Sequence, residues 1–445
     1  MQQSVMVRML AMGFVLLVLL VPLELTANII GERATRRGEV AADISKTWGG
    51  RQTLSGPMLS VPYRYQTREA GGAVTDHEGT LVLLPETLDV KGTLEPQSRH
   101  RGPFSSVVYT ARLTMLGRFA VPDVSSIRGV NPDVRWDEAV LSLAVDDPRG
   151  IASGLRTTWN GQALTMLPGV SDTGLGKAGV QARSVSVPAA APSTFEVQME
   201  LRGAESLALT PVGNDTTLVL ASSWPHPGFT LGQLPTTSRV GDHGFEARWQ
   251  TSWFARGFPA VWARGAIDEA QLASQAGTAA LGVALVQPVD VYQQSERAVK
   301  YAVLVIVLTL AVAFVREVTS GLAVHPIQYL FVGFGLSLFY LLLVSLAEHL
   351  PFAYAYAAAS AAVVGLLSWY WTGVLRSVRH GRVLAFALTA LYGYLYMLLR
   401  LEDFALLAGA TGLFVMLAAV MAMTRHIDWF SLQRSVTTQT TGRAS

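Results

Sequence analysis

The sequence contains no cysteine, and only 15% of its 445 residues are charged. The absence of cysteine excludes disulfides, thiolate catalysis and metal sites that use cysteine ligands. The net charge is +2 and no basic stripe is present, so nothing in the sequence favours binding to nucleic acid. Half of the residues are hydrophobic, which is too many for an ordinary soluble protein of this length.

Charge is nearly absent from long runs in the last third of the chain. A bilayer core of about 30 Å is crossed by about 20 apolar residues in a helix. Five such runs predict five spans, and the last four have no Asp, Glu, Lys or Arg in their interior. The runs are too long, and alternate too little, to be membrane strands. The predicted spans are Tyr301–Val315, Ile327–Ala347, Phe352–Leu375, Val383–Leu399 and Phe404–Thr424.

The residues between these runs predict the orientation of the chain in the membrane. An excess of arginine on one side marks the cytoplasm, whereas the opposite short loops are acidic or mixed. The C-terminus is therefore expected inside, and the first run is expected to begin outside. The cytoplasmic residues are Arg316, Arg376, Arg379, Arg382, Arg425 and Arg434, and those of the opposite loops are Glu348, His349, Arg400, Glu402 and Asp403.

A further apolar stretch, Met9–Ile30, lies near the N-terminus. It resembles a signal peptide because Pro22 ends its apolar core, but Leu25 is a poor minus-three residue for cleavage after Ala27. We therefore expect an uncleaved anchor, which gives six spans and places both termini in the cytoplasm. The following residues, Glu32–Trp48, are polar with interspersed apolar positions and predict a short helix leaving the membrane.

Between the anchor and the other spans, apolar and polar residues alternate, and Gly and Pro separate the segments. Such strands bury one face and expose the other to water. In the last strand below, Trp249 and Trp253 are expected on one face. The pattern predicts a β-rich, sandwich-like periplasmic domain inserted between the first two spans, and leaves open whether it has one pair of sheets or two subdomains. Clear examples are the strands Tyr109–Met115, Phe195–Arg202 and Phe245–Trp253, and the turn Asn160-Gly161.

Three other segments of the middle region carry expectations of their own. Ser171–Ala191 is rich in small residues and is expected to be an exposed loop. Ala266–Thr278 is expected to be a short helix or a loose connection, and Gly282–Val286 a final strand. The predicted organisation is an anchor at 1–30, a periplasmic β-rich domain at 31–297, a five-helix membrane block at 298–424 and a cytoplasmic tail at 425–445.

Short motifs spread over nearly the whole chain form a specific series, although each is weak alone. Taken in order, they resemble the CreD family of inner membrane proteins. The motifs are Gly31-Glu-Arg33, Leu54-Ser-Gly-Pro57, Asp147-Pro-Arg-Gly150, Ser223-Trp-Pro-His-Pro-Gly-Phe229, Gly244-Phe-Glu-Ala-Arg-Trp-Gln-Thr-Ser-Trp-Phe254, Pro288-Val-Asp-Val-Tyr-Gln293, Arg297-Ala-Val-Lys-Tyr301, His325-Pro-Ile-Gln-Tyr329, Phe339-Tyr-Leu-Leu-Leu343, Ala347-Glu-His349 and Thr424-Arg-His-Ile-Asp-Trp429.

The resemblance implies an N-terminal anchor, a large periplasmic domain and a C-terminal helical block. It also implies membership of the regulon of the CreBC two-component system. The family is associated with envelope integrity, with tolerance to certain colicins and with the response to β-lactams or cell-wall stress. It has no established enzymatic activity, cofactor or catalytic residue, so none is carried over to this chain.

The segment Trp224-Pro-His-Pro227 is the most unusual in the middle region. The prolines hold His226 in a rigid backbone, and Asp242 and His243 follow in the sequence. These residues are the candidate functional motif of the β-rich domain. A Zn²⁺ or Cu²⁺ site is the weaker interpretation, because the spacing matches no standard ligand pattern and turn rigidity explains the prolines.

Three ionisable residues flank one predicted span. His325 precedes Ile327–Ala347, and Glu348 and His349 follow it. A proton pathway needs ionisable groups at membrane depth, and these three residues lie at the edges. They are candidate membrane-edge sites, but a transport role is disfavoured because the charge that coupling requires is missing from the span.

The other features of the sequence indicate packing between helices and not a catalytic or ligand-binding site. No Gly-x-Ser-x-Gly elbow occurs, and Gly174-Leu-Gly-Lys-Ala-Gly179 is rejected as a phosphate cradle because it follows a polar loop. Tyr392 and Tyr396 share a helix face and could line a cavity, although aromatic packing is the default. Small residues would let helices approach closely. They are Gly333, Gly335, Ala357, Ala361, Gly409 and Gly412.

These observations favour a non-enzymatic protein of the bacterial inner membrane whose periplasmic domain binds or senses an envelope component. A transporter or flippase for an amphipathic envelope component is the alternative, and an enzyme acting on a wall precursor is a third possibility. The expected partners are membrane lipids and an unidentified periplasmic ligand, and a second copy of the chain is a further candidate. No cofactor is expected.

Overall fold

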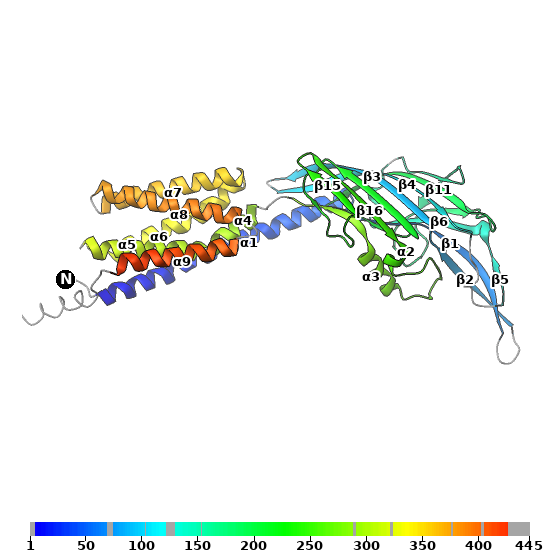
Figure 1. Cartoon of the computed structure of the whole chain (residues 1–445), viewed down its shortest axis with the longest axis horizontal. Coiled ribbons are helices and arrows are strands. Elements are labelled where there is room, and N and C mark those ends of the chain that lie inside the picture. Colours follow the sequence, from blue (N-terminus) through cyan, green and yellow to red (C-terminus); the bar gives the residue numbers. More distant parts are fainter. Residues whose placement is uncertain are drawn as a thin grey trace, which may run out of the picture. The chain divides into compact units, whose positions relative to one another are not determined.

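The computed structural model describes residues 5–68, 74–102, 104–121, 130–152, 154–287, 291–320, 324–374, 377–401 and 405–425. The chain forms two compact units, one of Met1–Arg36 with Val289–Ser445 and the other of Arg37–Pro288. The first is helical and the second is built mainly from strands (Figure 1). Helix α1 (Val5–Trp48) runs through the boundary between them without a break. The predicted anchor and the short helix after it are therefore one helix, and Pro22 lies inside it.

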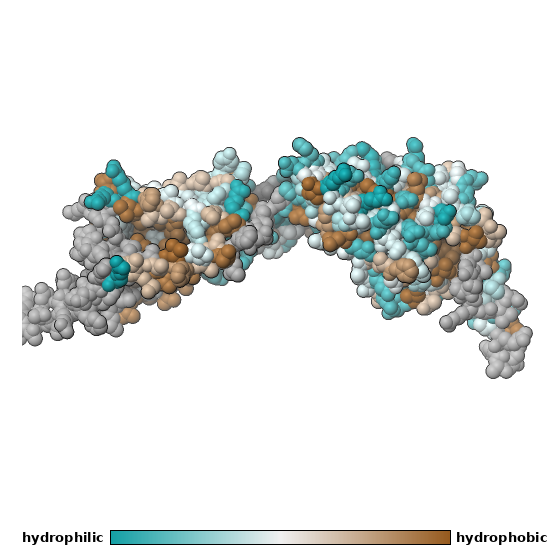
Figure 2. Space-filling view, in the orientation of Figure 1, coloured by the Kyte–Doolittle hydropathy of each residue, from teal (hydrophilic) through white to brown (hydrophobic). Residues whose placement is uncertain are grey.

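The helical unit packs around α6, whose side chains Leu336, Phe339 and Leu343 are fully buried. Large apolar residues remain on the outside, for example Phe14, Trp369 and Phe386, which are all more than two-thirds exposed. Figure 2 shows brown and tan areas over the helical unit. Such a surface suits a lipid environment and not water. Besides α1, the helices are α4 (Val291–Lys300), α5 (Ala302–Ser320), α6 (Pro326–Ala347), α7 (Phe352–Val374), α8 (Val378–Arg400) and α9 (Ala405–Thr424).

The number of spans differs from the six that the sequence predicts. Within the described residues, four helices are long and apolar enough to cross a membrane, namely α1, α6, α7 and α8. A fifth is reached only if α4 and α5 are one span, and they meet at a bend of 41° next to Tyr301. The prediction treated Tyr301–Val315 as a straight span and missed this bend. Over the described residues the structure therefore supports four or five spans, where the sequence predicts six, and the orientation of the chain stays a prediction.

The small residues of the helical unit serve close helix packing. A Cβ atom at Gly333 would collide with Leu19 of α1, and one at Gly335 would collide with Leu367 of α7. These glycines let neighbouring helices approach α6 more closely than a larger residue would.

The first sheet of the other unit centres on β1, which pairs in parallel with β12 and antiparallel with β6. Strands β2 and β5 also pair with β1, and β17 pairs with β2. In order across the sheet, the strands are β14 (Pro227–Gly228), β18 (Leu281–Leu285), β12 (Ser206–Thr210), β1 (Gln52–Arg68), β6 (Ala139–Val145), β10 (Gly179–Val185) and β9 (Leu167–Pro168), with β2 (Val74–Leu83), β5 (Val130–Val134) and β17 (Val261–Ala263) off this path.

The second sheet contains the long strands that dominate this unit in Figure 1. Its centre is again a parallel pair, β3 with β13, and the other pairs are antiparallel. In order, the strands are β15 (Thr237–Gly241), β16 (Gly244–Ser252), β13 (Asp215–Ser222), β3 (Thr87–Arg101), β4 (Phe104–Phe119), β11 (Ser193–Ala204), β7 (Arg156–Trp159) and β8 (Gln162–Leu164).

One hydrophobic core lies between the two sheets. It contains Met58 and Leu59 from the first sheet and Val90, Leu113 and Met115 from the second. Each sheet also includes strands from both the first and the second half of the β unit's sequence. The unit is therefore a single pair of sheets, which settles the alternative that the sequence leaves open.

Most strand expectations are confirmed. The alternation at Phe195–Arg202 becomes β11, whose inward residues are buried. The turn Asn160-Gly161 connects β7 to β8 with positive φ at both residues. The predicted final strand is β18, and Ala266–Thr278 contains helix α3 (Glu269–Ala279).

Two expectations are wrong. Ser171–Ala191 is not one exposed loop, because it contains the largely buried strand β10. Its glycines pack directly on β6, since a Cβ at Gly176 would collide with Ala144 and one at Gly179 with the carbonyl of Leu143. Trp249 and Trp253 do not share a face, because the short helix α2 (Trp253–Arg256) begins where β16 ends. Trp249 is buried, whereas Trp253 is half exposed.

Candidate functional site

The predicted motif of the β unit lies at the edges of the two sheets. The Trp224 Nε1 donates a hydrogen bond to the Val286 carbonyl at 2.9 Å, and the rings of Trp224 and His226 lie edge to face at 6.5 Å. His226 is exposed, and Asp242 and His243 form the exposed turn between β15 and β16. In the described part of the chain, no group of three or more His, Cys, Asp or Glu side chains could hold a metal ion.

The membrane-edge candidates lie at the two ends of α6 and serve different purposes. His325 caps its N-terminus, where Nδ1 accepts a hydrogen bond from the Ile327 N–H at 3.3 Å and Gln328 completes a capping box. Glu348 caps the other end and His349 is exposed. The structure therefore does not bring His325 together with Glu348 and His349.

Glu348 connects three helices of the helical unit. Its Oε1 lies 3.6 Å from the Arg33 Nε of α1 and accepts a hydrogen bond from the Tyr292 hydroxyl of α4 at 3.3 Å. The Glu348 side chain is only 13% exposed. A largely buried carboxylate with two partners on other helices fixes the ends of those helices relative to α6. Its position favours a structural role over proton transfer.

The end of α1 is held in the β unit by a buried glutamine. The Gln52 side chain is 1% exposed, and its Nε2 donates to the carbonyl oxygens of Gly49 at 2.6 Å, Asp147 at 3.1 Å and Arg202 at 3.2 Å. Its Oε1 accepts a hydrogen bond from the Asp147 N–H at 3.2 Å. One side chain thus joins Gly49, the residue after α1, to Asp147 after β6 and to Arg202 in β11.

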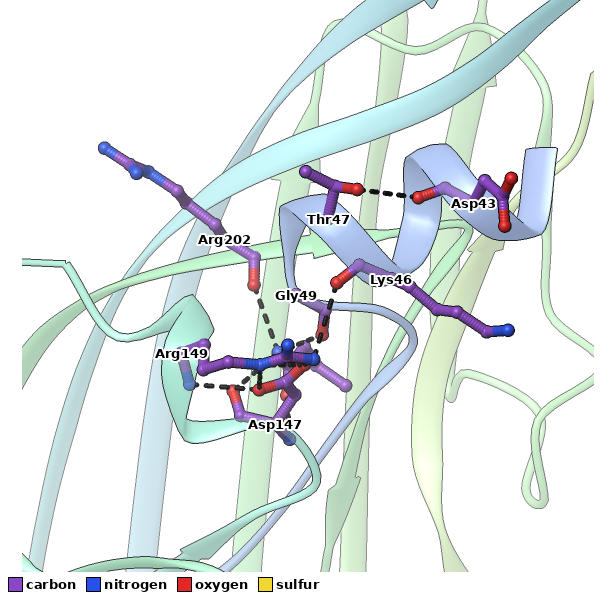
Figure 3. Close-up of polar contacts among 8 residues, drawn as sticks. Asp43, Lys46, Thr47, Gly49, Asp147, Arg149 and Arg202 are labelled. Atoms are coloured by element: carbon purple, nitrogen blue, oxygen red, sulfur yellow. Dashed lines mark hydrogen bonds and ion pairs between the residues drawn. The ribbon is translucent and has the colours of Figure 1, made fainter. Parts of the chain in front are cut away.

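The Asp147–Arg149 pair surrounds the same helix end (Figure 3). The Arg149 Nη2 lies 2.6 Å from the Asp147 Oδ2 and 3.4 Å from the carbonyl of Lys46 in the last turn of α1. A guanidinium near a helix C-terminus is favoured by the helix dipole. We call the contacts of Gln52, Asp147 and Arg149 with the end of α1 the helix clasp.

The second sheet holds α1 from the other side. The Trp48 Nε1 donates to the Tyr109 carbonyl at 3.3 Å, and the guanidinium groups of Arg99 and Arg202 lie 4.7 and 5.3 Å from the Trp48 ring. Asp43 forms an ion pair with Arg101 at 3.6 Å. Cation–π contacts and ion pairs add to the clasp, so the last two turns of α1 are fixed to both sheets.

The clasp predicts a specific dependence of stability on pH. The hydrogen bond from the Arg149 side chain lowers the pKa of Asp147. The carboxylate therefore stabilises the fold above its unfolded pKa of about 4, and this contribution is lost as the pH falls through the lower folded value. We expect Asp147→Asn to melt below the wild type at neutral pH and to match it only once the pH falls below the lowered pKa of the folded state. Asp146→Asn, at the exposed neighbour, is the control, and equal losses at both pH values would contradict the assignment.

An exposed apolar patch lies where β16 ends and α2 begins. The rings of Trp253 and Phe254 are 4.6 Å apart, and Phe254 is 81% exposed. Leu234 is 75% exposed, and the Gln233 Nε2 donates to the Ala255 carbonyl at 3.5 Å, which brings its loop to α2. Exposed apolar patches on a stable fold commonly mark contact surfaces. We call Leu234, Trp253 and Phe254 the aromatic patch.

A buried arginine supports this patch from below. Arg256 ends α2 and is 1% exposed, and burial lowers the pKa of its guanidinium to about 10. Its Nη1 donates to the Val212 carbonyl at 2.6 Å and its Nε to the Phe258 carbonyl at 2.9 Å. Its Nη2 donates to the Asn214 Oδ1 at 3.1 Å. The side chain stays protonated at neutral pH and holds α2 to two loops.

Sequence reasoning missed Gln52 and Arg256. Both are polar residues in segments that give no sign of burial, and their partners are backbone carbonyls, which no side-chain motif reveals. Asp147-Pro-Arg-Gly150 did stand out as a motif, but its contact with α1 depends on a long-range arrangement. The glycines around the clasp were the available signal, since a Cβ at Gly49 or Gly150 would collide with the carbonyl of Arg202.

Comparison with known proteins gives one family over nearly the whole chain. A family model described as inner membrane protein CreD matches residues 4–430. A curated relative, the inner membrane protein CreD of Escherichia coli strain K12, is 34% identical over 424 residues. The matched part covers 93% of this chain and 91% of that protein.

Proposed function

Because the chain belongs to the CreD family of inner membrane proteins, we propose that it is a non-enzymatic envelope protein with its β unit in the periplasm. In this proposal the β unit binds or senses a component of the envelope, and the membrane helices respond to its state. The several apolar helices make the chain a multi-pass membrane protein. The arginine distribution supports the periplasmic side for the β unit.

The observation that carries the proposal is the continuity of α1. One uninterrupted helix of 44 residues packs against the membrane helices near its start and is held by the clasp at its end. A helix fixed at both ends transmits rotation and displacement, whereas a flexible linker would absorb them. The chain returns through β18 and α4, so the β unit is tethered to the membrane unit at both of its ends.

The aromatic patch is the surface of the β unit that we assign to partner binding. Its three side chains are large, apolar and exposed, and the hydrogen bonds of Arg256 hold α2, which carries Trp253 and Phe254. Aromatic side chains on a rigid support are typical anchors of recognition surfaces. The expected consequences of this recognition are support of envelope integrity, tolerance to colicins and the response to β-lactams.

Breaking α1 tests the relay directly. We expect Ala41→Pro combined with Ala42→Pro to remove the envelope phenotypes, because two prolines in a helix interior remove hydrogen bonds and break it. The measurement is complementation of a deletion strain, read as detergent leakage, colicin survival and β-lactam survival. Membrane insertion and protease accessibility of the β unit in spheroplasts should match the wild type.

The matched control is Ala41→Ser with Ala42→Ser, which keeps the helix. Full complementation by the proline variant would show that an unbroken α1 is not needed to transmit the state of the β unit. A deletion strain that matches the wild type in all three phenotypes would remove the envelope function itself. Cleavage of the β unit only from the cytoplasmic side would overturn its proposed location.

A transporter is the second candidate, and one observation bears on it. A groove between α7 and α8 is lined mainly by apolar side chains. The sequence places no Asp, Glu, Lys or Arg between Val383 and Leu399 of α8 or inside α6 and α7. Coupled transport normally uses ionisable groups at membrane depth, so the groove suits a passive lipid site better than a transport path.

A further inference from the structure

A preformed groove lies between α7 and α8 in the helical unit. It has a volume of about 680 Å³, which is the size of a small-molecule site. Ala357, Ala361 and Gly365 line it from α7, and Tyr392, Gly393 and Tyr396 line it from α8. We call it the α7/α8 groove.

Small residues at every fourth position create the groove. Ala353, Ala357, Ala361 and Gly365 lie on one face of α7 and are all exposed. On α8, Gly393 likewise presents no side chain. A Cβ atom at Gly365 or at Gly393 would meet nothing within 4 Å. The groove is therefore open space between two membrane helices, and an apolar void against lipid loses packing contacts unless something fills it.

The base of the groove is rigid and aromatic. Tyr356 and Tyr392 are nearly buried, and the Tyr356 hydroxyl donates to the Tyr392 carbonyl at 2.7 Å, which joins the two helices. The Phe339 ring of α6 lies 4.4 Å from the Tyr392 ring and 5.3 Å from the Tyr356 ring. A site with such a base is organised before its ligand arrives, which lowers the cost of binding.

The length of the groove fits one leaflet of a bilayer. Its α7 wall extends from Ala353 to Gly365, and twelve residues of helix rise by about 18 Å. Half of a hydrocarbon core of about 30 Å is similar in length. A single acyl chain would occupy this length, whereas a packed helix from a second copy would use the whole of α7.

A fixed cation stands at one end of the groove. The Arg400 Nε donates to the Tyr396 hydroxyl at 3.2 Å, and its guanidinium carbon lies 5.6 Å from the Tyr396 ring centroid. Arg400 is exposed and ends α8. It pairs with no carboxylate of the described residues, and Glu402 and Asp403 lie outside them. Among the described residues, the two Nη groups of Arg400 have no carboxylate partner, and a guanidinium can bind a phosphate in two-point fashion.

We propose that the α7/α8 groove holds one acyl chain of an anionic phospholipid whose phosphate contacts Arg400. The apolar walls and the length of one leaflet match the acyl chain. The cation at the membrane edge matches the phosphate. Basic sites at the ends of grooves between membrane helices are a known means of binding anionic headgroups. This site is separate from the aromatic patch and the clasp, and it does not depend on the proposed sensing function.

The test is photocrosslinking of the full-length protein in vesicles. The probes are phosphatidylglycerol and phosphatidylcholine, each with a diazirine in one acyl chain, and mass spectrometry locates the attached peptides. We expect crosslinks on residues 353–365 and 389–396, with phosphatidylglycerol preferred. Gly365→Leu and Gly393→Leu fill the groove from opposite walls and should each lower the crosslink yield there about tenfold.

The matched control is Gly373→Leu, which lies on α7 away from the groove and also meets nothing within 4 Å. It should keep the wild-type yield. Arg400→Gln should keep crosslinking but lower the preference for phosphatidylglycerol about tenfold, because one charge-assisted contact is lost.

Four results would overturn the proposal. Unchanged yields in both groove-filling variants, or an equal loss in Gly373→Leu, would show that the lipid is not in the groove. An unchanged preference for phosphatidylglycerol in Arg400→Gln would show that Arg400 does not contact the headgroup. An absence of lipid adducts on residues 353–365 and 389–396 in the wild type would show that no acyl chain occupies the groove.

Discussion

Replacing Arg256 by methionine is expected to destabilise the β unit by about 3 kcal/mol, because buried acceptors lose their donors. The carbonyls of Val212 and Phe258 and the Asn214 Oδ1 all accept hydrogen bonds from this one side chain. Methionine fills similar volume but donates nothing, so these oxygens stay buried without a partner. In a unit of this size, the loss corresponds to a fall of about 6–12 °C in melting temperature.

The measurement is thermal unfolding of the full-length protein in detergent, followed by limited proteolysis of the β unit. Arg248→Met, on the exposed face of β16, is the control and should change stability by less than about 0.5 kcal/mol. Because Arg256 ends α2, the backbone amide hydrogens of the aromatic patch should also exchange faster in the variant. A melting temperature equal to that of the control would show that water replaces the guanidinium without cost.

The second large effect is expected at Gln52. Gln52→Leu keeps the size of the side chain but removes every hydrogen bond that it makes with Gly49, Asp147 and Arg202. We expect a loss of about 2–3 kcal/mol, because one buried and two partly buried carbonyls lose a donor. Since Gln52 holds the end of α1, we also expect the last turns of α1 to exchange amide hydrogens much faster.

Hydrogen exchange with mass spectrometry on the full-length protein separates the two consequences. Gln198→Leu, on the exposed face of β11, is the matched control and should leave α1 protected. Fast exchange confined to residues 40–50 would assign the loss to the clasp, whereas uniform loss over both sheets would assign it to general destabilisation. Wild-type protection throughout would show that Trp48 and Asp43 hold the helix alone.

Hydrophobic pattern predicted the elements that depend on local periodicity. The spans at α6, α7 and α8 and the strands β4 and β11 follow from residue spacing alone, because one face or the whole element is buried. The strand β10 was missed because its small residues look like a loop. Only the close approach of β6 makes glycine and alanine suitable there.

The candidate sites were harder to predict than the fold. The residues that stood out, such as His226 and His325, are an exposed edge residue and a helix cap. The groove was only hinted at by Tyr392, Tyr396 and two alanines, since its shape depends on how α7 and α8 lie together. Buried Gln52 and Arg256 satisfy backbone carbonyls, and such partners are set by tertiary structure and not by sequence spacing.

The parallel pairs at the centre of both sheets govern how the β unit can be made. Gln52 pairs with Leu207, and Thr87 pairs with Asp215, so the first half of the unit cannot close either sheet by itself. During synthesis the N-terminal strands are made first and keep open edges, which are prone to aggregation. Synthesis of the second half is thus the step that ends this exposure.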